Sequence, residues 1–268
     1  MRWRPYPVTL FDCDSTLSAV EGIDELPSDA ASQEEVAALT DAAMQGDTPL
    51  EDVYGRRLSL LNPTQGEIRG VKSKYKAAAV PDAQAVISAL NETGTETWII
   101  SGGLLEPVVE FATWLGVDAD RVRAVATEFD PLAGDWWDGG TDPLYADHDK
   151  GHLTTTTGKA DVIRGAVSTS GRRLLVGDGV SDLAAADEVD LFVAFAGVVS
   201  RPSVVSVAPV VVNSESLAPV LALSLGPARV KELVGGAHDS VARTCLDTID
   251  DGALSFNDSK LEQRFNGA

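Results

Sequence analysis

Four short apolar runs restrict the fold of this chain more than any other feature. They read VTLF at 8–11, TWIIS at 97–101, RRLLVGD at 172–178 and LFVAF at 191–195, with helical patterns between them. Continuous apolar runs of this length are typical of parallel strands that are buried on both faces of a sheet. The sequence therefore predicts an α/β fold with a Rossmann-like parallel sheet, in which ligands bind at the carboxyl ends of the strands.

Polar residues and glycines follow three of the expected strands. They are Asp12 and Asp14, then Ser101 with Gly102 and Gly103, then Asp178 and Asp182. Because side chains alternate along a strand, Asp12 and Asp14 should point the same way while Cys13 points into the core. Two like charges on one side of a strand end repel each other, and a divalent cation would offset that repulsion.

The other strand end offers groups that suit an anion. A serine hydroxyl and free glycine N–H groups at a helix start can bind phosphate, and Lys159, at the start of a later helix, would add positive charge. Taken alone, Ser101 with its glycines is ordinary turn chemistry, Lys159 is solvated surface and each acidic pair is a turn or helix cap. Together they predict a site for phosphoryl transfer.

A long stretch with little strand signal separates the first two expected strands. Apolar residues at helical spacing predict helices over 32–46, 49–61 and 64–75, so residues 18–79 are interpreted as a small helical insertion. An insertion there would cover the strand ends as a lid. Further on, the pieces of 124–158 suggest a hairpin, 203–213 predicts a last, edge-type strand, and no signal is found from 233 onward.

The composition of the chain limits the classes of binding partner and the cellular compartment that we expect. The net charge of −20, with 41 acidic and 21 basic residues, argues against nucleic acid and anionic membranes, whose phosphates would be repelled. We interpret the acidic excess as a halophilic surface, with an acidic protein from an ordinary source as the alternative. Two distant cysteines and the lack of an apolar run of membrane-spanning length predict a reduced, cytoplasmic protein.

The quoted motifs resemble those of a known family. In order along the chain, DCDST, the serine of SGG, Lys159 and GDGVSD are similar to the four motifs of the haloacid dehalogenase (HAD) superfamily of phosphohydrolases. The longer stretch DCDSTLSAVEGIDEL resembles the signature of the phosphoserine phosphatases. The resemblance implies an HAD core over 1–17 and 80–232, a helical cap over 18–79 and an extension of unknown role over 233–268.

The resemblance also implies roles for the residues of the strand ends. Asp12 would be the nucleophile that forms an aspartyl-phosphate, and Asp14 would protonate the leaving oxygen and then deprotonate the attacking water. Mg²⁺ would be held by Asp12, Asp178 and the backbone carbonyl of Asp14, with Asp182 in support. The phosphoryl oxygens would be bound by Ser101, Gly102, Gly103 and Lys159.

The insertion would recognise the rest of the substrate. Glu21 matches the residue that holds an ammonium group in the family, and Arg57 matches the arginine that binds a carboxylate, with Arg56 as the alternative should the register slip by one. Ser181, a further candidate contact to the substrate, stands where the family often has Asn or Thr, so it reaches less far.

The expected function is Mg²⁺-dependent hydrolysis of O-phospho-L-serine to serine and phosphate, the last step of serine synthesis. Two alternatives stay open: a related phosphatase for another small phosphomonoester, and a regulatory phosphate- or metal-binding module without catalysis. The intact set of nucleophile, acid, lysine and metal-binding carboxylates argues against the module. We expect a monomer or a homodimer whose partner is a small molecule.

Overall fold

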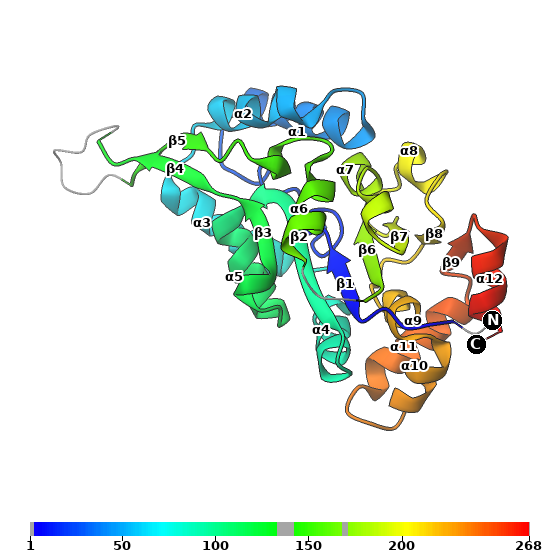
Figure 1. Ribbon diagram of the computed structural model, residues 1–268. Coiled ribbons are helices and arrows are strands. Elements are labelled where there is room, and N and C mark those ends of the chain that lie inside the picture. The colour runs from blue at the N-terminus through cyan, green and yellow to red at the C-terminus, as the bar shows by residue number, and fades with distance from the viewer. Residues whose placement is uncertain (1–2, 133–141, 168–170, 268) are drawn as a thin grey trace.

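The computed structural model describes residues 3–132, 142–167 and 171–267. In these residues a seven-stranded sheet forms the centre of the molecule, in the order β3-β2-β1-β6-β7-β8-β9 (Figure 1). Its strands are β1 (Val8–Phe11), β2 (Glu96–Leu104), β3 (Val122–Val125), β6 (Arg173–Gly177), β7 (Leu191–Phe195), β8 (Val210–Val212) and β9 (Leu254–Phe256). All neighbouring pairs are parallel except β8 and β9. The α/β fold predicted from the apolar runs is confirmed.

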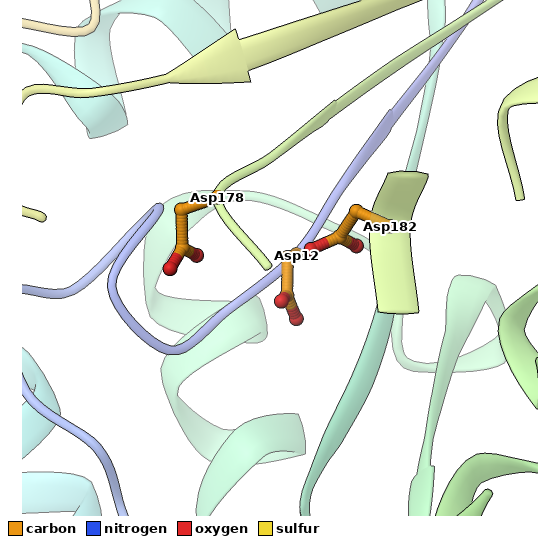
Figure 2. A group of neighbouring side chains, drawn as sticks. All are labelled: Asp12, Asp178 and Asp182. Atoms are coloured by element: carbon orange, nitrogen blue, oxygen red, sulfur yellow. The ribbon is translucent and has the colours of Figure 1, made fainter. Parts of the chain in front are cut away.

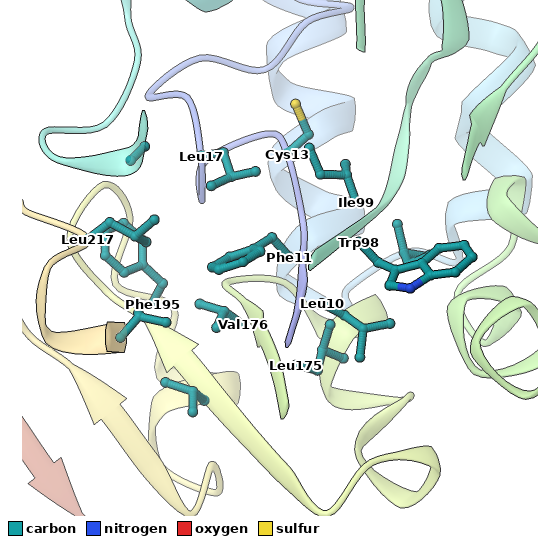
Figure 3. Packing of buried hydrophobic residues seen from close by; sticks show 14 of the residues in the cluster. Leu10, Phe11, Cys13, Leu17, Trp98, Ile99, Leu175, Val176, Phe195 and Leu217 are labelled. Atoms are coloured by element: carbon teal, nitrogen blue, oxygen red, sulfur yellow. The ribbon is translucent and has the colours of Figure 1, made fainter. Parts of the chain in front are cut away.

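The central strand shows why those runs are continuous. All four residues of β1 are buried, and the strand pairs with β2 on one side and β6 on the other. Leu10 and Phe11 pack among apolar side chains of both neighbours, including Ile99 and Val176 (Figure 3). Thr9, the polar residue of this strand, is satisfied by a hydrogen bond of 2.9 Å between its hydroxyl and that of Ser224. A strand enclosed on both faces leaves no position for an exposed polar residue.

The helices that accompany the sheet connect its strands. They are α4 (Ala83–Glu92), α5 (Leu105–Leu115), α6 (Gly158–Ala166), α7 (Val180–Leu183), α8 (Pro202–Val205), α9 (Pro219–Leu225) and α10 (Pro227–Leu233), with 3₁₀ turns at Ala119–Arg121, His152–Thr154 and Ala186–Glu188. Helices α4, α5 and α6 all contact β2. Among the described residues, none of the helices has both the length and the apolar character needed to cross a bilayer.

Three helices lie between β1 and α4, and together we call them the cap. They are α1 (Ala30–Gln45), α2 (Leu50–Leu61) and α3 (Gln65–Ala77), close to the three predicted segments. The first begins two residues before the predicted range of 32–46, because the side chain of Asp29 accepts from two backbone N–H groups and caps the helix there. The third begins with a capping box formed by Thr64 and Glu67. The domain boundaries proposed around this insertion stay predictions.

A hairpin of the core touches the cap. Strands β4 (Thr127–Asp130) and β5 (Leu144–His148) pair in antiparallel fashion, as the sequence suggested for 124–158. Residues 133–141, which include the tryptophans at 136 and 137, lie outside the described residues. Tyr145 N–H donates to Pro63 C=O at 2.8 Å, and Gln65 N–H donates to Pro143 C=O at 2.8 Å. These backbone bonds attach the hairpin to the turn between α2 and α3.

The carboxyl-terminal residues complete the sheet, which corrects one prediction. The edge strand expected over 203–213 begins with the short helix α8, and only Val210–Val212 form β8. This strand is not at the edge, because β9 pairs with it. The tail that gave no signal forms α11 (Asp239–Asp250), β9 and α12 (Ser259–Asn266). The Phe265 ring packs edge-on against Trp3, with centroids 5.1 Å apart, so the two ends of the chain lie together (Figure 1).

Candidate active site

A small buried cavity lies at the carboxyl ends of β1, β2 and β6, beneath the cap. Its volume is about 30 Å³. It is lined by Asp12, Asp14, Glu21, Gly22, Ile23, Met44, Leu50, Arg57, Gly102, Gly103, Lys159, Asp178 and Ser181. Two further predicted residues, Ser101 and Asp182, are buried directly behind this lining and hydrogen-bond to it. The strand ends and the cap therefore meet in one place, as the sequence led us to expect.

Three carboxylates form the most acidic part of this site. Asp12 follows β1, Asp178 follows β6, and Asp182 lies in α7, and one oxygen of each lies within 4.8 Å of the others (Figure 2). All three side chains are buried. Donors that are oxygen atoms only, with negative charge that burial leaves poorly screened, fit a hard divalent cation such as Mg²⁺. The predicted contribution of Asp14 to this site is through its backbone carbonyl, so its carboxylate is free for another role.

A lysine provides positive charge inside the same cluster. The ammonium of Lys159 lies 2.6 Å from Asp12 Oδ2 and 2.7 Å from Asp182 Oδ1. Burial opposes its charge, but the two carboxylates outweigh burial and raise the pKa of Lys159. Burial first, and then the charge of Asp12, raise the pKa of Asp178 to about 6 and that of Asp182 well above its usual range. The cluster therefore holds more negative charge than its single lysine offsets.

Asp14 is held separately from the three carboxylates. Its Oδ1 accepts hydrogen bonds from Gly22 N–H and from the Tyr75 hydroxyl, both at 2.7 Å, and its Oδ2 accepts from the Ser101 hydroxyl at 3.3 Å. Burial and the charge of Asp12 raise the pKa of Asp14 to about 6, although its donors oppose the shift. A carboxyl group with a pKa this close to neutrality can both donate and accept a proton.

The segment between β1 and α4 brings one acid and one arginine to the cavity, Glu21 from the loop before α1 and Arg57 from α2 of the cap. Glu21 accepts from the Ser15 hydroxyl at 2.7 Å, and burial, followed by the charges of Asp14 and Asp178, raises its pKa well above the usual range. Arg57 is 3% exposed, and its Nη1 donates to Thr40 at 2.9 Å. Its Nε is buried and has no hydrogen-bond partner among the described residues. This nitrogen is an unused donor in a residue that lines the cavity.

The neighbouring arginine, Arg56, has a different environment. Its side chain is 59% exposed and forms an ion pair with Glu35 on the surface of the cap. It does not line the cavity. Of the two registers that the sequence left open, this placement favours Arg57.

Among the residues that sequence reasoning missed, two donate hydrogen bonds to carboxylates of the site. Arg201, after β7, donates from Nε to Asp178 Oδ2 at 3.0 Å, and its Nη2 lies 3.8 Å from Glu21 Oε1. It follows the end of a predicted strand, so the rule that drew attention to the other strand ends could have found it. Tyr75, in α3, donates to Asp14. Its only signal was a helical spacing that equally describes a core residue.

Comparison with known proteins places the chain in a family. No family model matches the sequence. A phosphoserine phosphatase of Drosophila melanogaster is 31% identical over 201 residues, which cover 74% of this chain and 71% of that protein. A phosphoserine phosphohydrolase-like protein of Francisella tularensis superposes with a TM-score of 0.68 at 24% identity, over 83% of this chain and 99% of that one.

A second solved structure, described as a phospho-aspartyl intermediate analogue of phosphoserine phosphatase, gives a TM-score of 0.65 at 24% identity, over 81% of this chain and 98% of that one. The likeness to these two structures shows that the chain has the HAD fold. The identity and coverage of the Drosophila relative are more specific than the fold. The chain belongs to the phosphoserine phosphatase family.

Proposed function

We propose that the protein is a Mg²⁺-dependent phosphatase that hydrolyses O-phospho-L-serine to L-serine and phosphate. Membership of the phosphoserine phosphatase family supports this proposal. The observation that carries it is the composition of one buried cavity, in which Asp12 and Lys159 meet Glu21 and Arg57 of the cap segment. The first pair suits a phosphoryl group, and the second suits the two charged groups of an amino acid.

The chemistry takes two steps at the phosphorus atom. A carboxylate oxygen of Asp12 attacks phosphorus and forms an aspartyl-phosphate, while the bond to the serine oxygen breaks and that oxygen takes the proton of Asp14. Asp14, now ionised, removes a proton from a water molecule, which attacks the same phosphorus. The bond to Asp12 then breaks, phosphate leaves, and both aspartates return to their starting states.

Positive charge must balance an anionic nucleophile and an anionic substrate. Mg²⁺ would be held by Asp12, Asp178 and the backbone carbonyl of Asp14, with Asp182 in support, and when bound it supplies the charge that lets carboxylate and phosphate approach. Lys159 adds a fixed charge, because the carboxylates beside it keep its ammonium protonated. The backbone of Gly102 would contact the phosphoryl oxygens. Ser101 and Gly103 would lie beside the phosphoryl group, with the Ser101 hydroxyl donating to Asp14 and the Gly103 N–H donating to Ser101.

The amino-acid part of the substrate would bind to the cap. Arg57 has an unused buried donor, Nε, and an arginine can bind a carboxylate with two parallel hydrogen bonds. Glu21 would accept hydrogen bonds from the ammonium group, whose charge would offset the burial that raises the pKa of this carboxyl. Ser181 lines the cavity from α7 and would complete the contacts.

The position of the cap beside the cavity supports an opening motion. Met44 of α1 and Leu50 and Arg57 of α2 line the cavity together with strand-end residues of the core. Opening of the cap would admit the substrate, and closure would exclude bulk water from the aspartyl-phosphate.

Phosphate release from a panel of esters, with and without Mg²⁺, tests this proposal. Phosphoserine should be preferred over phosphothreonine, a sugar phosphate and p-nitrophenyl phosphate. Asp12→Asn should abolish turnover while the protein stays folded, and Asp187→Asn, at an exposed position, is the matched control. Equal rates across the panel would favour the broader phosphatase. Bound phosphate without any turnover would indicate the non-catalytic module.

Several finer points belong to the same proposal. Residues 18–79 would be the mobile cap, 1–17 and 80–232 the catalytic core, and 233–268 an extension. A role in serine biosynthesis in the cytoplasm would follow from the reaction, and two free buried cysteines, Cys13 and Cys245, fit a reducing compartment. The protein would be a monomer or a homodimer, which light scattering can decide.

A further inference from the structure

The carboxyl group of Asp14 receives hydrogen bonds that originate in the cap. We propose that Tyr75 of α3 is a positioning residue that holds Asp14 for proton transfer when the cap is closed. This inference rests on the proposed function, because it concerns how the acid-base group of that reaction is held in place.

The hydroxyl of Tyr75 is fixed from several sides. Its oxygen lies 2.7 Å from Asp14 Oδ1, and the side chain is completely buried. The ring stacks on Phe111 of α5 in the core, with centroids 5.4 Å apart and an angle of 23° between the planes. Packing therefore limits the positions that the hydroxyl can reach.

Two glycines leave the space that this hydroxyl needs. A Cβ atom at Gly22 would lie 2.0 Å from the Tyr75 oxygen, which is far inside van der Waals contact. A Cβ atom at Gly103 would lie 2.8 Å from Asp14 Oδ2 and 3.1 Å from the Tyr75 oxygen. The Tyr75 hydroxyl can approach the Asp14 carboxylate closely because neither Gly22 nor Gly103 has a side chain.

A second tyrosine of the cap reaches Asp14 by a longer route. The hydroxyl of Tyr54, in α2, donates to Gly102 C=O at 2.8 Å. The N–H of the same peptide unit belongs to Gly103 and donates to Ser101 Oγ at 2.9 Å, and the Ser101 hydroxyl donates to Asp14 Oδ2 at 3.3 Å. Each bond orients the donor of the next one. The last contact is long, so this route holds Asp14 less firmly than Tyr75 does.

Both oxygens of Asp14 are therefore held by groups that depend on the cap. The two tyrosines lie on cap helices, whereas Asp14 follows the core strand β1 and Ser101 lies within β2. If the cap moves away from the core, the carboxyl loses the Tyr75 bond directly and the Tyr54 support of Ser101. Asp14 is therefore fully oriented only when the cap is closed over a bound substrate. Proton transfer takes place in that state.

Tyr75→Phe removes the hydroxyl and keeps the ring. With phosphoserine, kcat should fall by about 10-fold to 100-fold, the range expected for losing a hydrogen bond to an ionised group, while KM changes less than about 2-fold. Tyr6→Phe is the matched control, because its hydroxyl contacts Arg172 away from the site. Thermal unfolding of each variant shows whether the fold is kept.

A substrate whose leaving group needs no proton distinguishes a positioning role of Tyr75 from a purely structural one. p-Nitrophenolate needs no proton to leave, so in Tyr75→Phe the pre-steady-state burst of nitrophenolate should keep the wild-type rate while steady-state turnover slows. A burst slowed as much as the turnover would overturn the proposal, and so would an unchanged kcat for phosphoserine. A raised KM with unchanged kcat would assign Tyr75 to substrate binding instead.

Tyr54→Phe tests the hydrogen bonds that lead to Oδ2 of Asp14, whereas Tyr75→Phe tests the bond to Oδ1. It should lower kcat less than Tyr75→Phe does, with the same unchanged burst. Should Tyr75→Phe fail to fold, a folded Tyr54→Phe with wild-type kcat would overturn the inference. A wild-type protein inactive on both esters would refute the proposed function as well, whereas an active wild type with no kcat effect in either variant would refute this inference alone.

Discussion

Replacing Arg201 by glutamine should destabilise the metal-free protein, because this arginine is a buried counter-ion. Its side chain is 2% exposed, its Nε donates to Asp178 at 3.0 Å, and Nη2 lies 3.8 Å from Glu21. With Lys159 it is one of the two buried cations that contact the acidic residues of the cavity in the described part of the chain. The substitution leaves Asp178 and Glu21 without this partner.

The size of the effect follows from the environment of the arginine. Breaking a buried ion pair by removing one partner costs about 3–5 kcal/mol. The lower end applies, because Arg201 Nη1 is buried without a hydrogen bond among the described residues and is compensated only by Asp41 Oδ1 at 3.9 Å, so its removal relieves part of that cost. At about 2–4 °C per kcal/mol for a protein of this size, ~3 kcal/mol lowers the melting temperature by about 6–12 °C.

Thermal unfolding in EDTA and in excess Mg²⁺ measures this effect. The loss should be largest in EDTA and smaller with Mg²⁺, since a bound cation restores positive charge beside Asp178. Arg164→Gln is the control, because its ion pairs with Asp161 and Glu188 are exposed and should contribute little. A fall of less than about 2 °C in EDTA, or one equal to that of the control, would refute this account of Arg201.

Three further results are expected. Arg57→Ala should raise KM for phosphoserine by about 10-fold to 100-fold while Arg56→Ala leaves it within about 2-fold, and equal effects in steady-state assays would contradict the assignment. Without metal, the raised pKa values of about 6 at Asp14 and Asp178 mean that the folded state binds more protons than the unfolded chain between the ordinary carboxyl pKa of about 4 and about pH 6, so stability is lost as pH rises across this interval. The melting temperature in EDTA should therefore fall between about pH 4 and about pH 6, and Mg²⁺ should weaken this trend; a rise over that interval in EDTA would show that these carboxyls are not destabilised by burial. If the net charge of −20 is a halophilic adaptation, activity and melting temperature should increase toward molar salt, and a protein most stable in dilute buffer would show otherwise.

The acidic strand ends could be predicted because their signal is local. Each lies beside an apolar run, and parallel strands place their carboxyl ends at one edge of the sheet. Asp12 and Asp178 are far apart in the sequence, yet this rule alone brings them together, and the structure places both in the lining of one cavity. The family resemblance added the assignments in the cap, which spacing alone did not supply.

Residues whose contacts depend on packing could not be predicted in this way. The helical position of Tyr75 indicates a buried face, but no pattern says that its hydroxyl meets Asp14. The edge strand was misjudged for a related reason. Strand β9 has three residues, too few for an alternating pattern, and its pairing with β8 joins residues that are far apart in the sequence.

The position of β1 in the middle of the sheet has a consequence for synthesis on the ribosome. Val8 pairs with Glu96 on one side and with Arg173 on the other, so the first strand to be made waits for partners that emerge much later. The cap helices, by contrast, need mainly neighbours in the sequence and can form earlier. A nascent chain that ends before residue 173 therefore exposes one edge of β1, and such an edge can pair with other chains over this interval of translation.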